Sequence, residues 1–253
     1  MSEAPAPGTA PRMIAVTGAS RGIGAAIALE LARRGYTVAC LTRRGGGPEC
    51  EIPAALSARL VSHACDVDDE TSVRTALEAL AVDGVLHGLV NNAGIHLDAP
   101  SHEMDTATYN RVMQTNAAAV FTTCREAYPY LARAGGATIV NIGSFFDKIG
   151  VKRNLAYCAS KAAVGAITRC LAVEWAGRGI AVLDVAPGYV VTDLNRESLE
   201  RGPVRDYIDK RIPGRRPGKA EEIARLVGAL FSEDIPFLTG ETIYIDGGQG
   251  IAH

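Results

Sequence analysis

Short apolar runs alternate along this chain with longer segments in which apolar residues recur at helical spacing. A strand buried on both faces of a parallel sheet gives a continuous apolar run, whereas an amphipathic helix that covers a sheet gives the second pattern. The alternation therefore predicts strands joined by helices. The predicted strands are Met13–Thr17, Tyr36–Leu41, Leu60–Cys65, Leu86–Val90, Ala137–Gly143, Ile180–Val185 and Glu241–Ile245.

The longest helical region is predicted from Asp105 to Arg133. We expect it to break near Pro129, because proline lacks the backbone N–H that a helix interior uses. Asn116 lies in its middle, where asparagine is unfavourable unless its side chain has another role. Strands that alternate with helices are typical of a Rossmann-type α/β fold, which is a single domain with a doubly wound, parallel seven-stranded sheet and helices on both faces.

Two stretches lie outside this pattern. Residues 1–12 are rich in Ala and Pro and are predicted to be a disordered leader, which leaves residues 13–253 as the domain. Residues 191–218 carry much charge, Gly and Pro, with only a weak helical pattern near Ser198–Lys210. We expect this second stretch to be a mobile substrate lid.

Composition narrows the possible functions. The 253 residues include 26 basic and 28 acidic side chains, with a net charge of −2 and no long run of either sign. This balance gives no support to nucleic-acid or membrane binding. Six cysteines without C-x-x-C spacing predict mostly buried thiols in a reducing compartment, and hence a cytoplasmic protein, with no metal site.

A glycine-rich turn, Gly18 to Gly24, follows the first predicted strand. Its G-x-x-x-G-x-G spacing places glycines where the backbone could turn tightly and approach a pyrophosphate at the start of a helix. A plain structural turn is the competing interpretation. The position directly after the first strand favours dinucleotide binding.

The second predicted strand ends in Thr42-Arg43-Arg44. In a dinucleotide fold, a carboxylate at this place binds the free adenosine ribose, whereas an arginine accommodates a 2′-phosphate. The arginines therefore favour NADP(H) over NAD(H). The alternative is a basic loop that only faces water.

Ser144, Tyr157 and Lys161 could together move a proton on and off an oxygen. Tyr157 and Lys161 are four residues apart and so project from one face of a predicted helix. A nearby ammonium can lower the pKa of a phenol, about 10 unperturbed, toward the operating pH. Taken alone, such a pair is more often a solvated contact.

Together these features make the chain similar to the short-chain dehydrogenase/reductase family, over essentially its whole length from Met13 to Gly248. The first motif and the C-terminal T-G-E-T-I-Y-I-D-G-G resemble the 3-oxoacyl-ACP reductase branch. The motifs that carry the resemblance are Thr17–Gly24, Asp66-Val67, Asn91–Gly94, Asn116, Ser144, Tyr157–Lys161, Pro187–Asp193 and the terminal I-D-G-G.

The resemblance implies that hydride passes between a nicotinamide and a carbonyl or alcohol carbon. Tyr157 would be the general acid/base, Lys161 would lower its pKa and hold the nicotinamide ribose, and Ser144 would position the substrate oxygen. Asn116 would hold a water in a proton relay to Lys161.

The resemblance also implies the cofactor contacts. Ser20 and Arg21 would surround the adenosine phosphates. Asp66 would meet the adenine, Asn92 the neighbouring ribose and Val190 the nicotinamide carboxamide. The full expected set is Gly18, Ser20, Arg21, Gly22, Ile23, Gly24, Thr42, Arg43, Asp66, Val67, Asn92, Ala93, Gly94, Tyr157, Lys161, Pro187, Gly188, Val190 and Thr192.

The substrate region departs from much of the family, because two phenylalanines, Phe145 and Phe146, follow Ser144. They suggest an apolar substrate face, although either could belong to the core. His96 and Tyr189 fall near the same pocket, where His96 either binds substrate or lies unengaged at the rim. Phe146, His96 and Tyr189 are the expected substrate contacts.

The sequence thus predicts an NADP(H)-dependent carbonyl reductase or secondary-alcohol dehydrogenase acting on a small molecule. The alternatives are an NAD-dependent alcohol dehydrogenase and a dinucleotide-binding sensor or scaffold without catalysis. A sugar-nucleotide epimerase would need the other glycine spacing and a longer C-terminal region. The last predicted helix, Lys219–Phe231, carries an apolar stripe. In relatives this region forms an interface, so a homotetramer is expected, although the stripe could simply cover the sheet.

Overall fold

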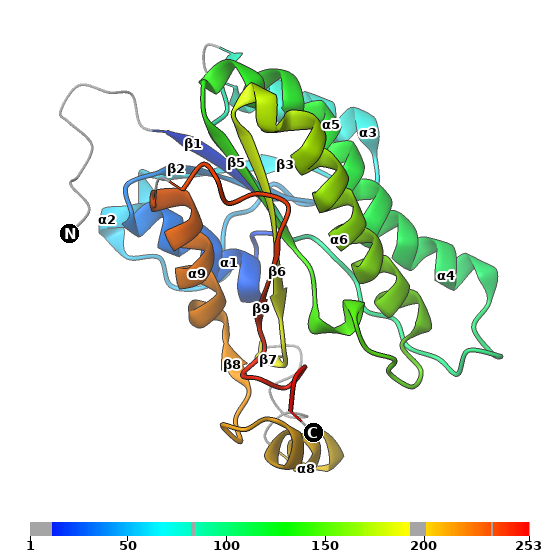
Figure 1. Cartoon of the computed structure of the whole chain (residues 1–253). Coiled ribbons are helices and arrows are strands. Elements are labelled where there is room, and N and C mark those ends of the chain that lie inside the picture. Colours follow the sequence, from blue (N-terminus) through cyan, green and yellow to red (C-terminus); the bar gives the residue numbers. More distant parts are fainter. Residues whose placement is uncertain (1–11, 82–83, 193–200, 234, 253) are drawn as a thin grey trace.

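A parallel seven-stranded sheet forms the centre of the computed structural model, which describes residues 12–81, 84–192, 201–233 and 235–252 (Figure 1). The strand order is β3-β2-β1-β4-β5-β6-β9. The order reverses between β1 and β4, which is the doubly wound arrangement that the sequence predicts. The strands are β1 (Met13–Thr17), β2 (Thr37–Thr42), β3 (Leu60–Ala64), β4 (Gly88–Asn91), β5 (Ala137–Ile142), β6 (Ile180–Pro187) and β9 (Thr242–Ile245).

Helices cover both faces of the sheet. In Figure 1, α1 and α9 lie on one face, and α3, α5 and α6 lie on the other. The helices are α1 (Gly22–Arg33), α2 (Ala54–Ser57), α3 (Glu70–Leu80), α4 (Thr106–Met113), α5 (Ala119–Leu131), α6 (Leu155–Trp175), α8 (Pro203–Arg211) and α9 (Ala220–Ser232).

The two faces of the sheet bury two separate hydrophobic cores. Along β1, Ala15 packs into the core beneath α3, α5 and α6, whereas Ile14 and Val16 pack into the core beneath α1 and α9. Successive side chains of a strand point to opposite faces, so one strand contributes to both cores. This explains why the strands appear in the sequence as continuous apolar runs.

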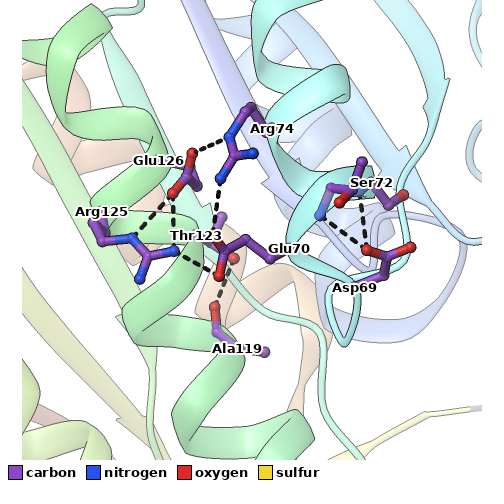
Figure 2. A network of polar contacts seen from close by, with 9 residues as sticks. Asp69, Glu70, Ser72, Arg74, Ala119, Thr123, Arg125 and Glu126 are labelled. Atoms are coloured by element: carbon purple, nitrogen blue, oxygen red, sulfur yellow. Dashed lines mark hydrogen bonds and ion pairs between the residues drawn. The ribbon is translucent and has the colours of Figure 1, made fainter.

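A surface network joins α3 to α5 and is shown in Figure 2. Arg74 of α3 bonds Glu126 of α5 at 3.0 Å, and Arg125 of α5 bonds Glu70 of α3 at 2.8 Å. Asp69 caps α3 by accepting a hydrogen bond from the backbone N–H of Thr71. Exposed ion pairs of this kind stabilise by about 0–1 kcal/mol each, so the network mainly fixes the alignment of the two helices.

The long helical region is interrupted at Asn116, and the prediction of a break near Pro129 is wrong. A π-helical turn, Gln114–Ala118, separates α4 from α5, while Pro129 lies near the end of the continuous helix α5. The side chain of Asn116 bonds the backbone of Ile95 on a neighbouring loop. Such bonds hold the helix locally in the wider turn, and π-turns of this type are frequent at functional sites.

Residues 191–218, predicted as a lid, begin and end side by side. Val190–Val191 (β7) pairs with Gly218–Lys219 (β8) in a two-stranded ladder. Along the chain, helix α8 comes after β7 and before β8. It is a regular nine-residue helix, although the sequence near Ser198–Lys210 shows only a weak helical pattern. Residues 193–200 and the predicted leader up to residue 11 lie outside the described residues. Of the helices that the structure describes, none is long and apolar enough to cross a membrane.

The apolar stripe on α9 faces the interior. Ile223 and Val227 are buried in the core that α9 shares with α1, so the stripe covers the sheet. The exposed apolar side chains near the C-terminus come from other elements. Phe237 and Ile251 are 99% and 78% exposed, and Tyr244 on the edge strand β9 is also accessible.

Candidate active site

Two adjoining cavities open at the carboxyl ends of β1, β4, β5 and β6. One has a volume of about 330 Å³ and the other about 390 Å³. Ligands of open α/β sheets bind at this edge, where the strand order reverses. The residues common to both linings are Ile23, Asn92, Gly94, Ile95 and Thr192.

The glycine turn forms a cradle at the base of the first cavity. Gly18 has φ of +65°, and a Cβ placed on it would lie 2.9 Å from the Cα of Ala93. A Cβ on Gly24 would lie 2.2 Å from the carbonyl oxygen of Gly18. The Asn92 amide donates to that same oxygen and to the carbonyl of Thr17, both at 3.1 Å. Only glycine fits these positions, and the start of α1 faces the cavity.

This cradle suits the pyrophosphate of a dinucleotide. Arg21 is the N-cap of α1 and makes no side-chain capping bond, and the first turn of the helix contains no acidic residue. The first N–H groups of a helix together with its dipole attract an anion. The residues present therefore fit the cofactor that the sequence predicts.

The lining of the first cavity includes basic side chains. Arg21 and Arg43 both line it, as do Asp66 and Val67, whereas Arg44 is not part of the lining. Thr42 is buried and its hydroxyl donates to the carbonyl of Gly46 at 2.9 Å. Six further lining residues, which the sequence analysis missed, are Leu41, Cys65, Asp68, Ile95, Arg111 and Thr115.

The second cavity contains the three residues expected to move a proton. Ser144 follows the end of β5, and Tyr157 and Lys161 lie one turn apart on α6. The Ser144 side chain lies close enough to the Tyr157 hydroxyl to lower the pKa of Tyr157. Ser144 also accepts a hydrogen bond from the backbone N–H of Phe146 at 3.3 Å, which fixes its orientation.

The pKa of Tyr157 differs from the expectation. Burial raises it above the usual value of 10.0, and the Ser144 side chain opposes this only in part. The expected lowering by Lys161 is not among the influences on this group. The amino group of Lys161 lies 5.6 Å from the centre of the Tyr157 ring and donates to the carbonyl of Ile142 at 2.7 Å. In this structure the phenol therefore stays protonated at neutral pH.

Lys161 and Asp184 are two buried charged groups between α6 and β6. Lys161 is 6% exposed, and burial lowers its pKa to about 8. Asp184 is 0% exposed, and burial raises its pKa to about 6. The hydroxyl of Thr242 donates to one carboxylate oxygen at 3.2 Å, and the other oxygen has no hydrogen-bond partner among the described residues.

Asp184 was missed by the sequence analysis. The sequence contains one indication of its role: Asp184 is an acidic residue within the otherwise apolar run Ile180–Val185, which is predicted to be a buried strand. A buried carboxylate is costly unless it is paired or protonated. Its place beside Lys161 makes it part of the site.

Asn116 holds the loop that follows β4. Its amide oxygen accepts from the N–H of Ile95 at 2.8 Å, and its amide nitrogen donates to the carbonyl of Ile95 at 2.9 Å. It also donates to the hydroxyl of Ser160, on the helix that carries Tyr157, at 3.1 Å. Asn116 thus links three segments: the loop that follows β4, the π-turn and α6.

The three expected substrate contacts, His96, Phe146 and Tyr189, all line the second cavity. His96 packs edge-on against Tyr157, with 4.9 Å between ring centres, and is hydrogen-bonded to Asn154. Phe145 lines the same cavity and is almost fully buried. It is therefore both a buried residue and part of the cavity wall, and the two alternatives offered by the sequence do not exclude each other.

Every cofactor residue that the sequence predicts lies in one of the two linings. Fourteen of them, Gly18, Ser20, Arg21, Gly22, Ile23, Gly24, Thr42, Arg43, Asp66, Val67, Asn92, Ala93, Gly94 and Thr192, line the first cavity. Tyr157, Lys161, Pro187, Gly188 and Val190 line the second.

The cysteines only partly match the expectation of buried thiols. Cys40, Cys65 and Cys124 are buried, but Cys50 and Cys170 are exposed, and all six are free. Within the described ranges, no cluster of three or more His, Cys, Asp or Glu side chains could hold a metal ion.

Residues 18–249 match the model of a family described as enoyl-(acyl carrier protein) reductase. The chain is 36% identical to the 3-oxoacyl-[acyl-carrier-protein] reductase of Haemophilus influenzae, over 92% of this chain and 96% of that protein. It belongs to the short-chain dehydrogenase/reductase family. The family consists of oxidoreductases that bind NAD(P).

Relatives of this short-chain dehydrogenase/reductase differ in substrate. A D-threitol dehydrogenase of Mycolicibacterium smegmatis is 35% identical, over 93% of this chain and 92% of that protein. A candidate 2-deoxy-D-gluconate 3-dehydrogenase of Agrobacterium tumefaciens, solved with bound NADP, has a TM-score of 0.85 and 33% identity, covering 94% of this chain and 96% of that one. The seven-stranded fold is thereby confirmed.

Proposed function

We propose that this protein transfers hydride between NADP(H) and a ketone or secondary alcohol, with Tyr157 as the general acid/base. The observation that carries the proposal is that Ser144, Tyr157 and Lys161 come together in the lining of the cavity adjoining the glycine cradle. The cofactor, when bound, supplies or accepts the hydride. The protein's own residues bind, orient and exchange the proton.

Tyr157 donates its hydroxyl proton to the carbonyl oxygen as the carbonyl carbon is reduced. The raised pKa suits this role, because the phenol is protonated at neutral pH. Ser144, held by the backbone of Phe146, donates a hydrogen bond to the same substrate oxygen. Lys161 supplies a buried positive charge near the developing phenolate and helps to hold the nicotinamide ribose.

The cofactor-binding residues act by geometry and charge. The turn at Gly18 and the start of α1 receive the pyrophosphate, and Val190 lies where the nicotinamide carboxamide would bind. Arg21 and Arg43 both line the cavity in which the adenosine 2′-phosphate would bind, which supports this choice of cofactor. Charge-assisted hydrogen bonds to phosphate contribute about 1.5–3 kcal/mol each, which favours NADP(H).

The test is a turnover assay with the purified full-length protein. Ketones are reduced with NADPH and secondary alcohols are oxidised with NADP⁺, and nicotinamide absorbance is followed. We expect turnover in both directions with the phosphorylated cofactor. Binding of NADPH without turnover of any ketone or alcohol would point to the non-catalytic sensor, and preferential use of NAD(H) would point to the NAD-dependent alcohol dehydrogenase.

A further inference from the structure

A row of aromatic rings begins at Tyr157 in the second cavity and continues beyond the cavity lining to α8. We define the aromatic row as Tyr157, Phe146, Tyr189 and Tyr207. Its successive ring centres are 5.9, 6.2 and 5.9 Å apart, and each pair is edge-to-face. These spacings and angles are those that aromatic pairs prefer, so the row is a stable surface.

The row is supported from behind. Phe145 packs against Phe146 at 4.7 Å and against Tyr189 at 5.6 Å between ring centres. Ser144, from which both phenylalanines continue, is fixed by its bond to the Phe146 backbone. The outer end, Tyr207, lies on α8 and accepts a hydrogen bond from Gln249 at 3.4 Å. The rings are therefore in place before any substrate arrives.

Most of the residues that line the second cavity are apolar, and its polar residues are Asn92, His96, Ser144, Tyr157, Lys161, Tyr189 and Thr192. Ser144, Tyr157 and Lys161 belong to the proton-transfer site, and His96 is hydrogen-bonded to Asn154 at the rim. The phenyl and phenol rings of the lining beyond Tyr157 are those of Phe145, Phe146 and Tyr189, and Tyr207 packs against Tyr189 from outside the lining. A polyhydroxylated substrate would lose water hydrogen bonds against these rings, whereas a flat apolar group would gain by burial.

We infer that the site takes ketones, and the corresponding secondary alcohols, in which one substituent of the reacting carbon ends in an aryl or other flat apolar group that lies along Phe146 and Tyr189, with Tyr207 supporting Tyr189 at the outer end of the row. This inference rests on the proposed function. It distinguishes the protein from relatives that are named for polyols and sugars.

The experiment compares three ketones with NADPH and the full-length protein: 4-phenyl-2-butanone, 2-butanone and erythrulose. The first two differ only by a phenyl group, and the third replaces apolar surface by hydroxyls. Burial of a phenyl group predicts that kcat/KM for 4-phenyl-2-butanone exceeds that for 2-butanone by roughly 10- to 100-fold. Erythrulose should be the poorest of the three.

Two substitutions then test whether the aromatic row causes the preference for the phenyl ketone. In Tyr189→Leu and in Tyr207→Leu, the ratio of kcat/KM for 4-phenyl-2-butanone to that for 2-butanone should fall about 3- to 10-fold. Because the readout is a ratio, a general loss of folded protein does not imitate the result. Phe237→Leu, which changes a fully exposed ring outside the cavity, should leave the ratio unchanged.

Three results would overturn the inference: equal kcat/KM for the phenyl ketone and 2-butanone, a preference for erythrulose, or a ratio that neither tyrosine variant changes. These results leave the proposed function intact, because each requires turnover of a ketone. Absence of turnover for every ketone and alcohol with either cofactor would instead reject the proposed function, and this inference with it.

Discussion

Lys161 on α6 and Asp184 on β6 are both buried, and each moves the pKa of the other toward its charged form. Burial is the larger influence on both groups and favours their neutral forms. The Asp184 carboxylate raises the pKa of Lys161 and so opposes the lowering by burial. The Lys161 ammonium lowers the pKa of Asp184 and so opposes the raising by burial. Asp147 is a further charged neighbour that raises the pKa of Asp184.

The pair predicts a specific pH dependence. Ketone reduction should decline as the pH rises through about 8, where the buried Lys161 loses its proton. In Asp184→Asn the lysine loses the negative charge that supports its ammonium form, so this alkaline limb should move to lower pH. The measurement is kcat/KM against pH with a good ketone.

Thr242→Val is the matched control for Asp184→Asn. It removes the hydrogen bond to the same carboxylate and keeps its charge, so the alkaline limb should stay near that of the parent. A limb that stays in place in Asp184→Asn, or that moves equally in both variants, would show that Asp184 has only a structural role.

Tyr157→Phe should abolish most turnover and leave NADPH binding close to normal. Phenylalanine keeps the ring contacts with His96 and Phe146 and removes only the hydroxyl. A general acid/base contributes about 10²- to 10⁴-fold in rate. The measurements are kcat and the NADPH dissociation constant. A kcat within tenfold of the parent value would exclude Tyr157 as the proton donor.

Arg43→Ala should reduce the preference for NADPH over NADH by about tenfold, after allowance for the solvent exposure of the side chain. Arg44→Ala is the matched control, because Arg44 is the exposed neighbour outside the cavity lining. The ratio of kcat/KM with NADPH to that with NADH is measured for each. Better use of NADH by the parent, or equal effects of the two variants, would contradict the assignment of the 2′-phosphate site.

Gly18→Ala should weaken NADPH binding by tenfold or more. Its methyl group would lie 2.9 Å from the backbone of Ala93, and the φ of +65° disfavours a side chain by about 1–2 kcal/mol. Gly35→Ala is the comparison, because Gly35 also has a positive φ but no atom lies near its added Cβ. Both variants should melt earlier, and only Gly18→Ala should lose cofactor affinity. Normal NADPH binding by Gly18→Ala would argue against the cradle.

The protein should assemble as a homotetramer with two-fold symmetry. The apolar stripe of α9 is used inside the molecule, but Phe237, Ile251 and the edge strand β9 are left exposed. Light scattering at micromolar concentration should give about four times the chain mass of 26.6 kDa. Phe237→Asp should lower this mass. A parent mass near 26.6 kDa would exclude the tetramer.

Much of the fold could be predicted because the central strands β1, β4, β5 and β6 are buried on both faces and are therefore mostly apolar in the sequence, whereas the edge strand β3 is largely exposed. The bounds of β1 match the prediction, whereas β4 starts two residues later than its apolar run. Leu86 is buried without belonging to the ladder, so burial alone does not mark where a strand begins. Helix α2 has no buried residue and no apolar periodicity to reveal it.

The site could be predicted for a different reason. Parallel strands end at one edge of the sheet, so motifs that follow β1, β4 and β5 must meet there. The sequence could not show which way Lys161 points, because its bond to Ile142 depends on how α6 packs on β5. The same packing places Asp184 next to Lys161. These are tertiary relationships between segments that are distant in the chain.

The π-turn at Gln114–Ala118 has a consequence for how this helix tolerates length changes. Its wider turn accommodates one residue more than an α-helical turn, between α4 and α5. Deletion of one residue there should return the segment to a uniform α-helix and leave the flanking helices near their present positions. The wide turn from which Asn116 reaches Ile95 and Ser160 would be lost, so the deletion would disturb the active site without changing any residue that lines it.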